Sequence, residues 1–74
     1  MAYNGHKNWA HWNVSLWLFN EEPLYRLACR AMKFAPNRDE AARRLLRDLP
    51  PTTPDGARYT FSAVRAAIGK DSGL

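Results

Sequence analysis

Five side chains of this sequence are candidates for catalysis or metal binding: His6, His11, Cys29, Glu21 and Glu22. A structural zinc site has four ligands, and two histidines with one cysteine in an apolar segment do not supply them. No histidine is placed to activate Cys29, so we expect a small core residue there rather than a nucleophile. The paired glutamates suit a helix start, and the chain has no glycine-rich phosphate loop. We therefore predict no catalytic residue, metal or cofactor, and expect that the protein is not an enzyme.

Basic residues are the second group to which a binding role can be assigned. They recur at helical spacing on two expected helices, as Arg26, Arg30 and Lys33 and then as Arg43, Arg44 and Arg47. The connection between these helices, Ala35–Asn37, is short, so antiparallel packing would bring both sets to one surface. Such a surface could bind an acidic protein surface, or phosphates with an affinity that falls steeply as salt rises.

A solvated face with local ion pairs is the alternative explanation for these residues. Helical spacing allows the pairs Asp39–Arg43, Glu40–Arg44 and Arg44–Asp48. A sequence-specific DNA reader is not expected, because the connection lacks the glycine-containing turn of a helix-turn-helix. The formal charge of +4 permits nucleic-acid or acidic protein partners but requires neither.

All three tryptophans lie in one apolar segment, NWAHWNVSLWLFN, at residues 8–20. We favour a helix here over a strand, because the later segments are helical and no partner strand is obvious. Helical spacing groups Trp9, Trp12, Leu16 and Phe19 on one face of this helix. The residues expected to point to other sides are Val14, Trp17 and Leu18.

A helix that is apolar on every side allows two explanations. Either the other helices wrap it, or part of its surface contacts a second copy of the chain or a different protein. We count Trp17 as a candidate anchor for such a partner, because tryptophan buries a large rigid area at interfaces. Asn13 lies inside the segment, and a buried amide must be hydrogen-bonded. We therefore expect Asn13 to hold a neighbouring loop or helix end.

Start signals divide the rest of the chain into short helices. Helix starts are expected at the capping residues Asn8, Asn37 and Thr60 and beside Pro23. The proline-rich segment 49–59, LPPTTPDGARY, is predicted to be a loop. We expect one small domain over 1–74, an all-α compact bundle of three to four short helices, with 1–7 and 70–74 flexible. Its predicted core is Trp9, Trp12, Leu16, Leu27, Leu45, Leu49, Phe61, Val64 and Ile68.

The cellular location is predicted from three sequence features. No apolar run approaches the roughly 20 residues of a membrane helix. The N-terminus lacks the basic stretch, apolar core and small-residue cleavage site of a signal peptide. The single cysteine cannot form an internal disulfide, which favours a reducing compartment. We therefore expect a protein of the host cell cytoplasm that does not associate with the membrane.

The segment from Tyr3 to Ala28 resembles a family of short proteins from bacteria, phages and plasmids, through a pattern like Y-N-G-x-x-N-W-x-x-W-N-V-x-L-W-x-x-N-[DE]-x-x-L-Y. The matching positions are Tyr3, Asn4, Gly5, Asn8, Trp9, Trp12, Asn13, Val14, Leu16, Trp17, Asn20, Glu21, Leu24 and Tyr25. The segment from Thr53, TPDGARYTFSAVRAAI, is similar to the family's second block. Pro23 departs from the pattern, which has a glycine or small residue there.

The resemblance implies a setting on mobile elements but supplies no established activity. Small phage proteins such as anti-CRISPRs act by occupying a surface of a host nuclease complex, without catalysis. We therefore expect a non-enzymatic binding protein of a mobile element, an inhibitor of a host defence complex that meets an acidic surface of a host protein. Two other functions stay open: a nucleic-acid-binding accessory protein that uses the same arginines, and a homodimer formed through the uncovered side of the tryptophan helix.

Overall fold

The computed structural model describes residues 8–69, in which four α-helices follow one another along the chain. They are α1 (Trp9–Asn20), α2 (Glu22–Phe34), α3 (Arg38–Asp48) and α4 (Phe61–Gly69). This part of the chain has no strand, and its extended pairing is limited to an isolated bridge between Thr52 and Arg58. The predicted all-α bundle of short helices is therefore confirmed. The segments 1–7 and 70–74, predicted to be flexible, lie outside the described residues.

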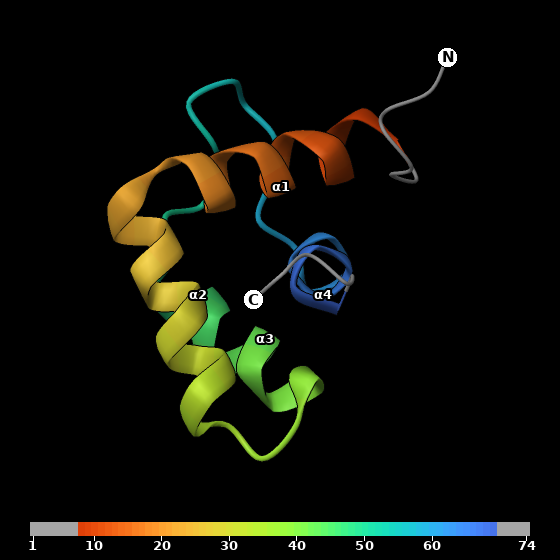
Figure 1. The fold of residues 1–74 in the computed structure, drawn as a ribbon. Coiled ribbons are helices and arrows are strands. Elements are labelled where there is room, and N and C mark those ends of the chain that lie inside the picture. The colour runs from red at the N-terminus through yellow and green to blue at the C-terminus, as the bar shows by residue number, and fades with distance from the viewer. Residues whose placement is uncertain (1–7, 70–74) are drawn as a thin grey trace.

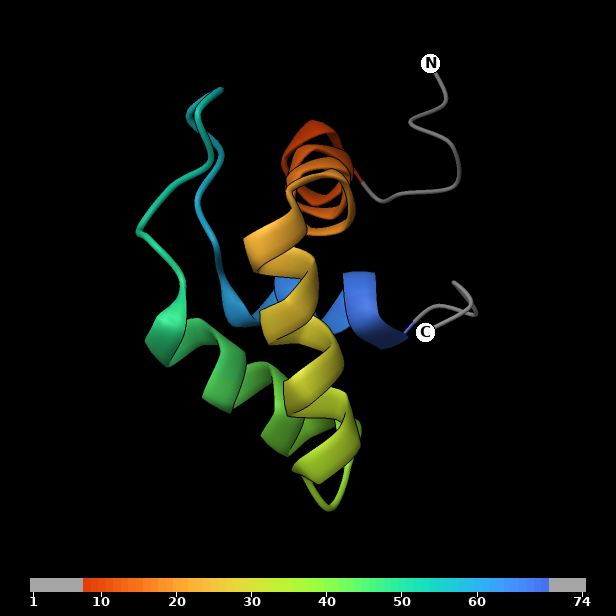
Figure 2. The same cartoon turned by 60° about the vertical axis from the view of Figure 1, so that its left-hand side comes forward.

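The helices form a closed ring of contacts. α1 packs against α2 and α4, and α3 packs against the same two helices. Figure 1 shows α2 running away from the end of α1, with α3 beside its far half and α4 between α1 and α3. In the turned view of Figure 2, the loop between α3 and α4 rises along the side of α1 before α4 begins. The loop therefore lies against α1 although it is distant from it in sequence.

Local signals set the helix starts. In residues 8–69, three helices begin at a side chain that accepts a hydrogen bond from the first turn, as the sequence predicts. The bonds are Asn8 Oδ1 from His11 N at 3.0 Å, Asn37 Oδ1 from Glu40 N at 2.8 Å and Thr60 Oγ1 from Ala63 N at 3.1 Å. α2 instead has Pro23 in its first turn, where the missing N–H removes no helical hydrogen bond.

The core of the described residues consists mainly of small and medium-sized apolar side chains. Its buried members are Val14, Leu18, Ala28, Ala41, Ala42, Leu45, Ala57, Tyr59, Ala63, Val64, Ala67 and Ile68. Half of them are alanine, which allows the helix backbones to approach closely. Of the predicted core, Leu45, Val64 and Ile68 are buried, and Leu27 and Leu49 pack against it while partly exposed.

The prediction that Trp9, Trp12 and Leu16 of α1 lie in the core is wrong. All three are partly exposed, and Trp9 is 41% exposed. Val14 and Leu18 are fully buried instead, together with Asn13. Because α1 is apolar on all sides, apolar spacing alone does not fix its rotation. Phe61, also predicted in the core, is 39% exposed.

Candidate partner-binding groove

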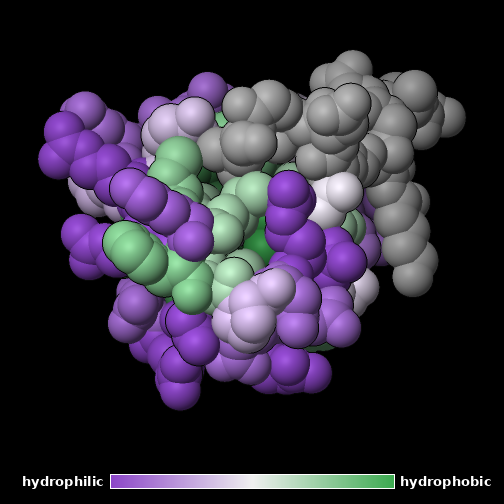
Figure 3. Space-filling model, turned by 60° about the horizontal axis from the view of Figure 1, so that its bottom comes forward, coloured by the Kyte–Doolittle hydropathy of each residue, from purple (hydrophilic) through white to green (hydrophobic). Residues whose placement is uncertain are grey.

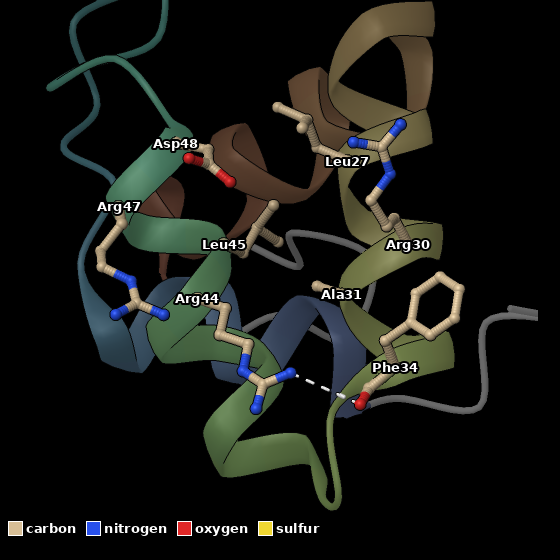
Figure 4. A pocket seen from close by; sticks show the side chains of 8 residues that line it. All are labelled: Leu27, Arg30, Ala31, Phe34, Arg44, Leu45, Arg47 and Asp48. Carbon is tan, nitrogen blue, oxygen red and sulfur yellow. Dashed lines mark hydrogen bonds between the residues drawn. The ribbon is translucent and has the colours of Figure 1, made fainter.

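α2 and α3 enclose a surface groove of about 460 Å³, the α2–α3 groove. Its lining residues are Leu27, Arg30, Ala31 and Phe34 of α2 and Arg44, Leu45, Arg47 and Asp48 of α3 (Figure 4). The α2 members follow the spacing i, i+3, i+4, i+7, so they belong to one helix face. Figure 3, which views the molecule from the α2–α3 end, shows an apolar area bordered by hydrophilic side chains.

The floor of the groove is apolar. Leu45 is buried in the core, and Leu27 and Ala31 pack against that core while remaining partly exposed. Phe34 stands at one end of the groove and is 67% exposed, the most exposed large apolar side chain among the described residues. When a partner covers apolar surface of this kind and removes it from water, the free energy of the system falls, which favours binding.

Three of the six predicted basic residues border this floor: Arg30 from α2 and Arg44 and Arg47 from α3. Arg44 is held in place, because its Nε donates to the Glu40 carboxylate at 3.2 Å and its Nη1 to the Phe34 carbonyl oxygen at 3.4 Å. Arg30 and Arg47 are exposed and form no ion pair with any acidic residue in 8–69. The groove thus presents one fixed guanidinium and two that are available to a partner.

The other three predicted basic residues lie outside the groove lining. Arg26 forms an ion pair at 2.9 Å with Glu22 in its own helix, and both side chains are about three-quarters exposed. Lys33 Nζ lies 5.5 Å from the centre of the Phe34 ring. The Arg43 guanidinium lies 5.6 Å from the centre of an aromatic ring in α4. Only half of the residues in the two predicted basic stripes therefore border the α2–α3 groove.

Local ion pairs form in part as expected. Arg44 pairs with Glu40, which is confirmed, and Glu40 also contacts Arg43 at 3.5 Å. The expected pairs that do not form within residues 8–69 are Asp39–Arg43 and Arg44–Asp48. Asp39 accepts a bond at 2.7 Å from Arg65 of α4 instead. This contact joins two helices, which spacing within one helix could not indicate.

Trp17, predicted as a partner anchor, lies outside the groove and binds the loop between α3 and α4. Its Nε1 donates to Asp55 Oδ2 at 2.9 Å. Asn13 donates to the same oxygen at 2.9 Å and accepts a bond from Thr53 Oγ1 at 2.6 Å. The predicted role of Asn13 in holding a loop is confirmed. The hydrogen bond from Trp17 to Asp55 was not predictable from the sequence.

Asp55 is the residue on which these bonds converge. The hydrogen bond from Asn13, followed by that from Trp17, holds the pKa of the Asp55 carboxyl below its ordinary value, against an opposing effect of desolvation. Gly56 follows with a φ of 98°, a conformation that glycine adopts without strain. The turn Pro54-Asp55-Gly56 was recognisable in the sequence, but the role of its carboxylate was not.

Residues 1–69 match a family described as Family of unknown function (DUF7249). The chain belongs to the DUF7249 family. No curated protein and no solved structure matches the chain significantly. The family description assigns no activity. The α2–α3 groove is therefore the feature of this DUF7249 member that bears on its function.

Outside the groove, the described side chains of this DUF7249 member that have the chemistry for catalysis make contacts within the protein. Ser62 Oγ lies 3.2 Å from His11 Nε2 at an exposed contact between α4 and α1, and His6 lies outside the described residues. Cys29, predicted in the core, is only partly buried, and its hydrogen bond with Tyr25 raises the pKa of that hydroxyl. Residues 8–69 contain no cluster of three metal-ligating side chains. None of their helices is long and apolar enough to cross a membrane.

Proposed function

We propose that this DUF7249 member is a non-enzymatic binding protein that holds an acidic surface of a partner protein in its α2–α3 groove. The position of Arg30 and Arg47 carries the proposal. Both are exposed, neither is paired with an acid in residues 8–69, and they border an apolar floor from different helices. Apolar burial supplies association free energy, while rim charges steer and select the partner. A surface with carboxylates around an apolar contact complements both features.

A protein partner fits the groove better than nucleic acid does. Glu40 pairs with Arg44, and Asp48 lines the groove, so the positive charge is interrupted. A phosphate backbone is followed best by an uninterrupted row of cations. Leu27 and Leu45 in the floor would also find no apolar partner in such a backbone. Nucleic-acid binding through the same arginines is the alternative, and a comparison of peptide and DNA binding distinguishes it from protein binding.

The proposed role is inhibition of a host defence complex in the cytoplasm of a bacterial host. The resemblance of the tryptophan motif to proteins of phages and plasmids supports this role. Covering a surface of a defence complex requires affinity but no catalysis. The exposed Phe34 and the available arginines of the α2–α3 groove are side-chain types that are enriched at protein interfaces.

Phage plating tests the inhibitor role. The protein is expressed in strains that each carry one RNA-guided nuclease complex with a phage-targeting guide, beside matched strains with a non-targeting guide. We expect plaque numbers to rise only in the targeting strain of the complex that contains the partner. Arg30→Glu combined with Arg47→Glu should abolish the rise, because the reversed charges repel an acidic surface.

The matched control combines Arg26→Glu with Arg58→Glu. It gives the same net charge as the groove double variant, at two exposed residues outside the groove lining and away from the Phe34 ring. We expect this control to inhibit as the unchanged protein does, since exposed ion pairs contribute little. Plaque numbers that never respond to the protein would contradict the defence role. Inhibition that survives in the groove double variant would contradict the groove as the binding surface.

A further inference from the structure

The walls and charges of the α2–α3 groove indicate which element of a partner enters it. We infer that the occupant is an amphipathic α-helix, with apolar residues toward the groove floor and carboxylates on both flanks. This inference rests on the proposed function and deepens it by naming the chemistry of the partner. The α2 lining runs from Leu27 to Phe34, about two helical turns, so the occupant buries a face of about two turns.

The two walls favour a helix over an extended segment. Both walls are α-helices, whose backbone N–H and C=O groups bond within each helix along its middle turns. An extended segment on this floor would find no backbone partners, and unpaired buried backbone groups are unfavourable. The isolated bridge between Thr52 and Arg58 lies outside the groove lining. A helix brings its own backbone hydrogen bonds and can lay its apolar face into the groove.

The arginines require carboxylates on both flanks of that helix. Arg30 projects from α2 and Arg47 from α3, on different sides of the apolar floor (Figure 4). An occupant with carboxylates on one flank would leave one of these guanidiniums without a partner. Arg44 adds a third positive group that Glu40 and the Phe34 carbonyl oxygen already hold in place. A fixed guanidinium loses little side-chain entropy when it binds a further acceptor.

Asp48 makes the two ends of the groove electrostatically different. It lies toward the Leu27 end, whereas Arg44 and Phe34 lie toward the opposite end (Figure 4). Carboxylates of the occupant are therefore favoured near Arg44 and disfavoured near Asp48. The exposed ring of Phe34 also offers an apolar edge at the favoured end. On the α3 side of the occupant, the acidic residues therefore lie toward Arg44, whereas the Arg30 guanidinium meets a carboxylate near Leu27 on the α2 side (Figure 4).

Selection from a displayed library of random peptides tests the inference. The peptides have about 15 residues, the length at which an isolated helix becomes marginally stable. Binding to the labelled protein is sorted in the presence of excess unlabelled Arg30→Glu/Arg47→Glu protein, which removes peptides that bind elsewhere. We expect enriched peptides to carry leucine, methionine or aromatic residues at i, i+4 and i+7, with Asp and Glu on both sides.

Charge exchange on one enriched peptide gives a matched measurement of affinity. The groove double variant should bind it about tenfold more weakly, the effect of losing two rim pairs and gaining repulsion. The same peptide with lysine in place of each acid should bind the double variant better than the unchanged protein. The Arg26→Glu/Arg58→Glu control should bind the original peptide normally. Such a reciprocal exchange does not arise from a loss of folding.

Several results would overturn the inference. These are no enrichment, enrichment of proline-containing or basic peptides, and acidic peptides without helical spacing. A duplex DNA oligonucleotide that binds more tightly than the enriched peptide at about 0.15 M salt would overturn it in favour of phosphate binding. If plaque numbers depend on Arg30 and Arg47 but no acidic helix is selected, only the helical occupant is wrong. If acidic helices are selected but plaque numbers never respond, only the defence role is wrong.

Discussion

At the scale of single residues, Asn13 joins the helix that carries the tryptophans to the loop that precedes α4. Its side chain is 1% exposed, and it donates to Asp55 at 2.9 Å and accepts from Thr53 at 2.6 Å. Leaving a buried amide unpaired costs about 1–3 kcal/mol, so these bonds restrict how α1 and the loop can pack. A bonded Asn13 was predictable because a buried amide must be paired. Asp55 was not, because several polar loop residues could serve and packing selects among them.

Asp55 leads us to predict a loss of stability in acid. Hydrogen bonds from Asn13 and Trp17 place the pKa of Asp55 in the folded protein below its pKa in the unfolded chain. These bonds therefore add stability at neutral pH that is lost as the pH falls through the folded pKa. Thermal unfolding between neutral pH and about pH 3 should show a smaller fall in melting temperature for Asp55→Asn than for the unchanged protein. An identical fall in both would contradict the assigned bonds.

At the scale of the helices, boundaries follow from local sequence but faces depend on tertiary contacts. The caps and the proline at the start of α2 act within one turn, so the sequence predicts them directly. α1 is apolar all round, and its bonds from Asn13 and Trp17 to the loop accompany the rotation that buries Val14 and Leu18. The partners of these bonds lie in a distant segment, which the spacing within 8–20 cannot reveal.

Truncations in α1 test which of its faces is inward. Leu18→Ala removes a fully buried side chain and should lower the free energy of unfolding by about 2–5 kcal/mol. Trp9→Ala removes a larger side chain but should lower it less, because Trp9 is 41% exposed. Urea unfolding followed by circular dichroism measures both changes. A cost for Trp9→Ala that equals or exceeds that of Leu18→Ala would show that the tryptophan face is inward.

At the scale of the whole molecule, the packing of α2 against α3 creates the candidate binding site. Spacing along each helix predicted two basic stripes, and the short connection predicted that they lie close together. The members that border the groove are Arg30, Arg44 and Arg47, and those outside it are Arg26, Lys33 and Arg43. This division depends on how one helix crosses the other, which residue spacing does not encode. The apolar floor between the helices was likewise recognisable only once both were placed.

Site-specific photo-cross-linking in cells that express the protein most directly tests the central claim that the α2–α3 groove binds a protein. Benzoylphenylalanine replaces Phe34, which is 67% exposed in the groove, or, in a control, Trp9 at the start of α1. We predict that light links one discrete host protein to position 34. The Trp9 control should give no such adduct, and Arg30→Glu with Arg47→Glu should remove it from position 34. No protein adduct at position 34, or an adduct that nuclease digests, would contradict the claim.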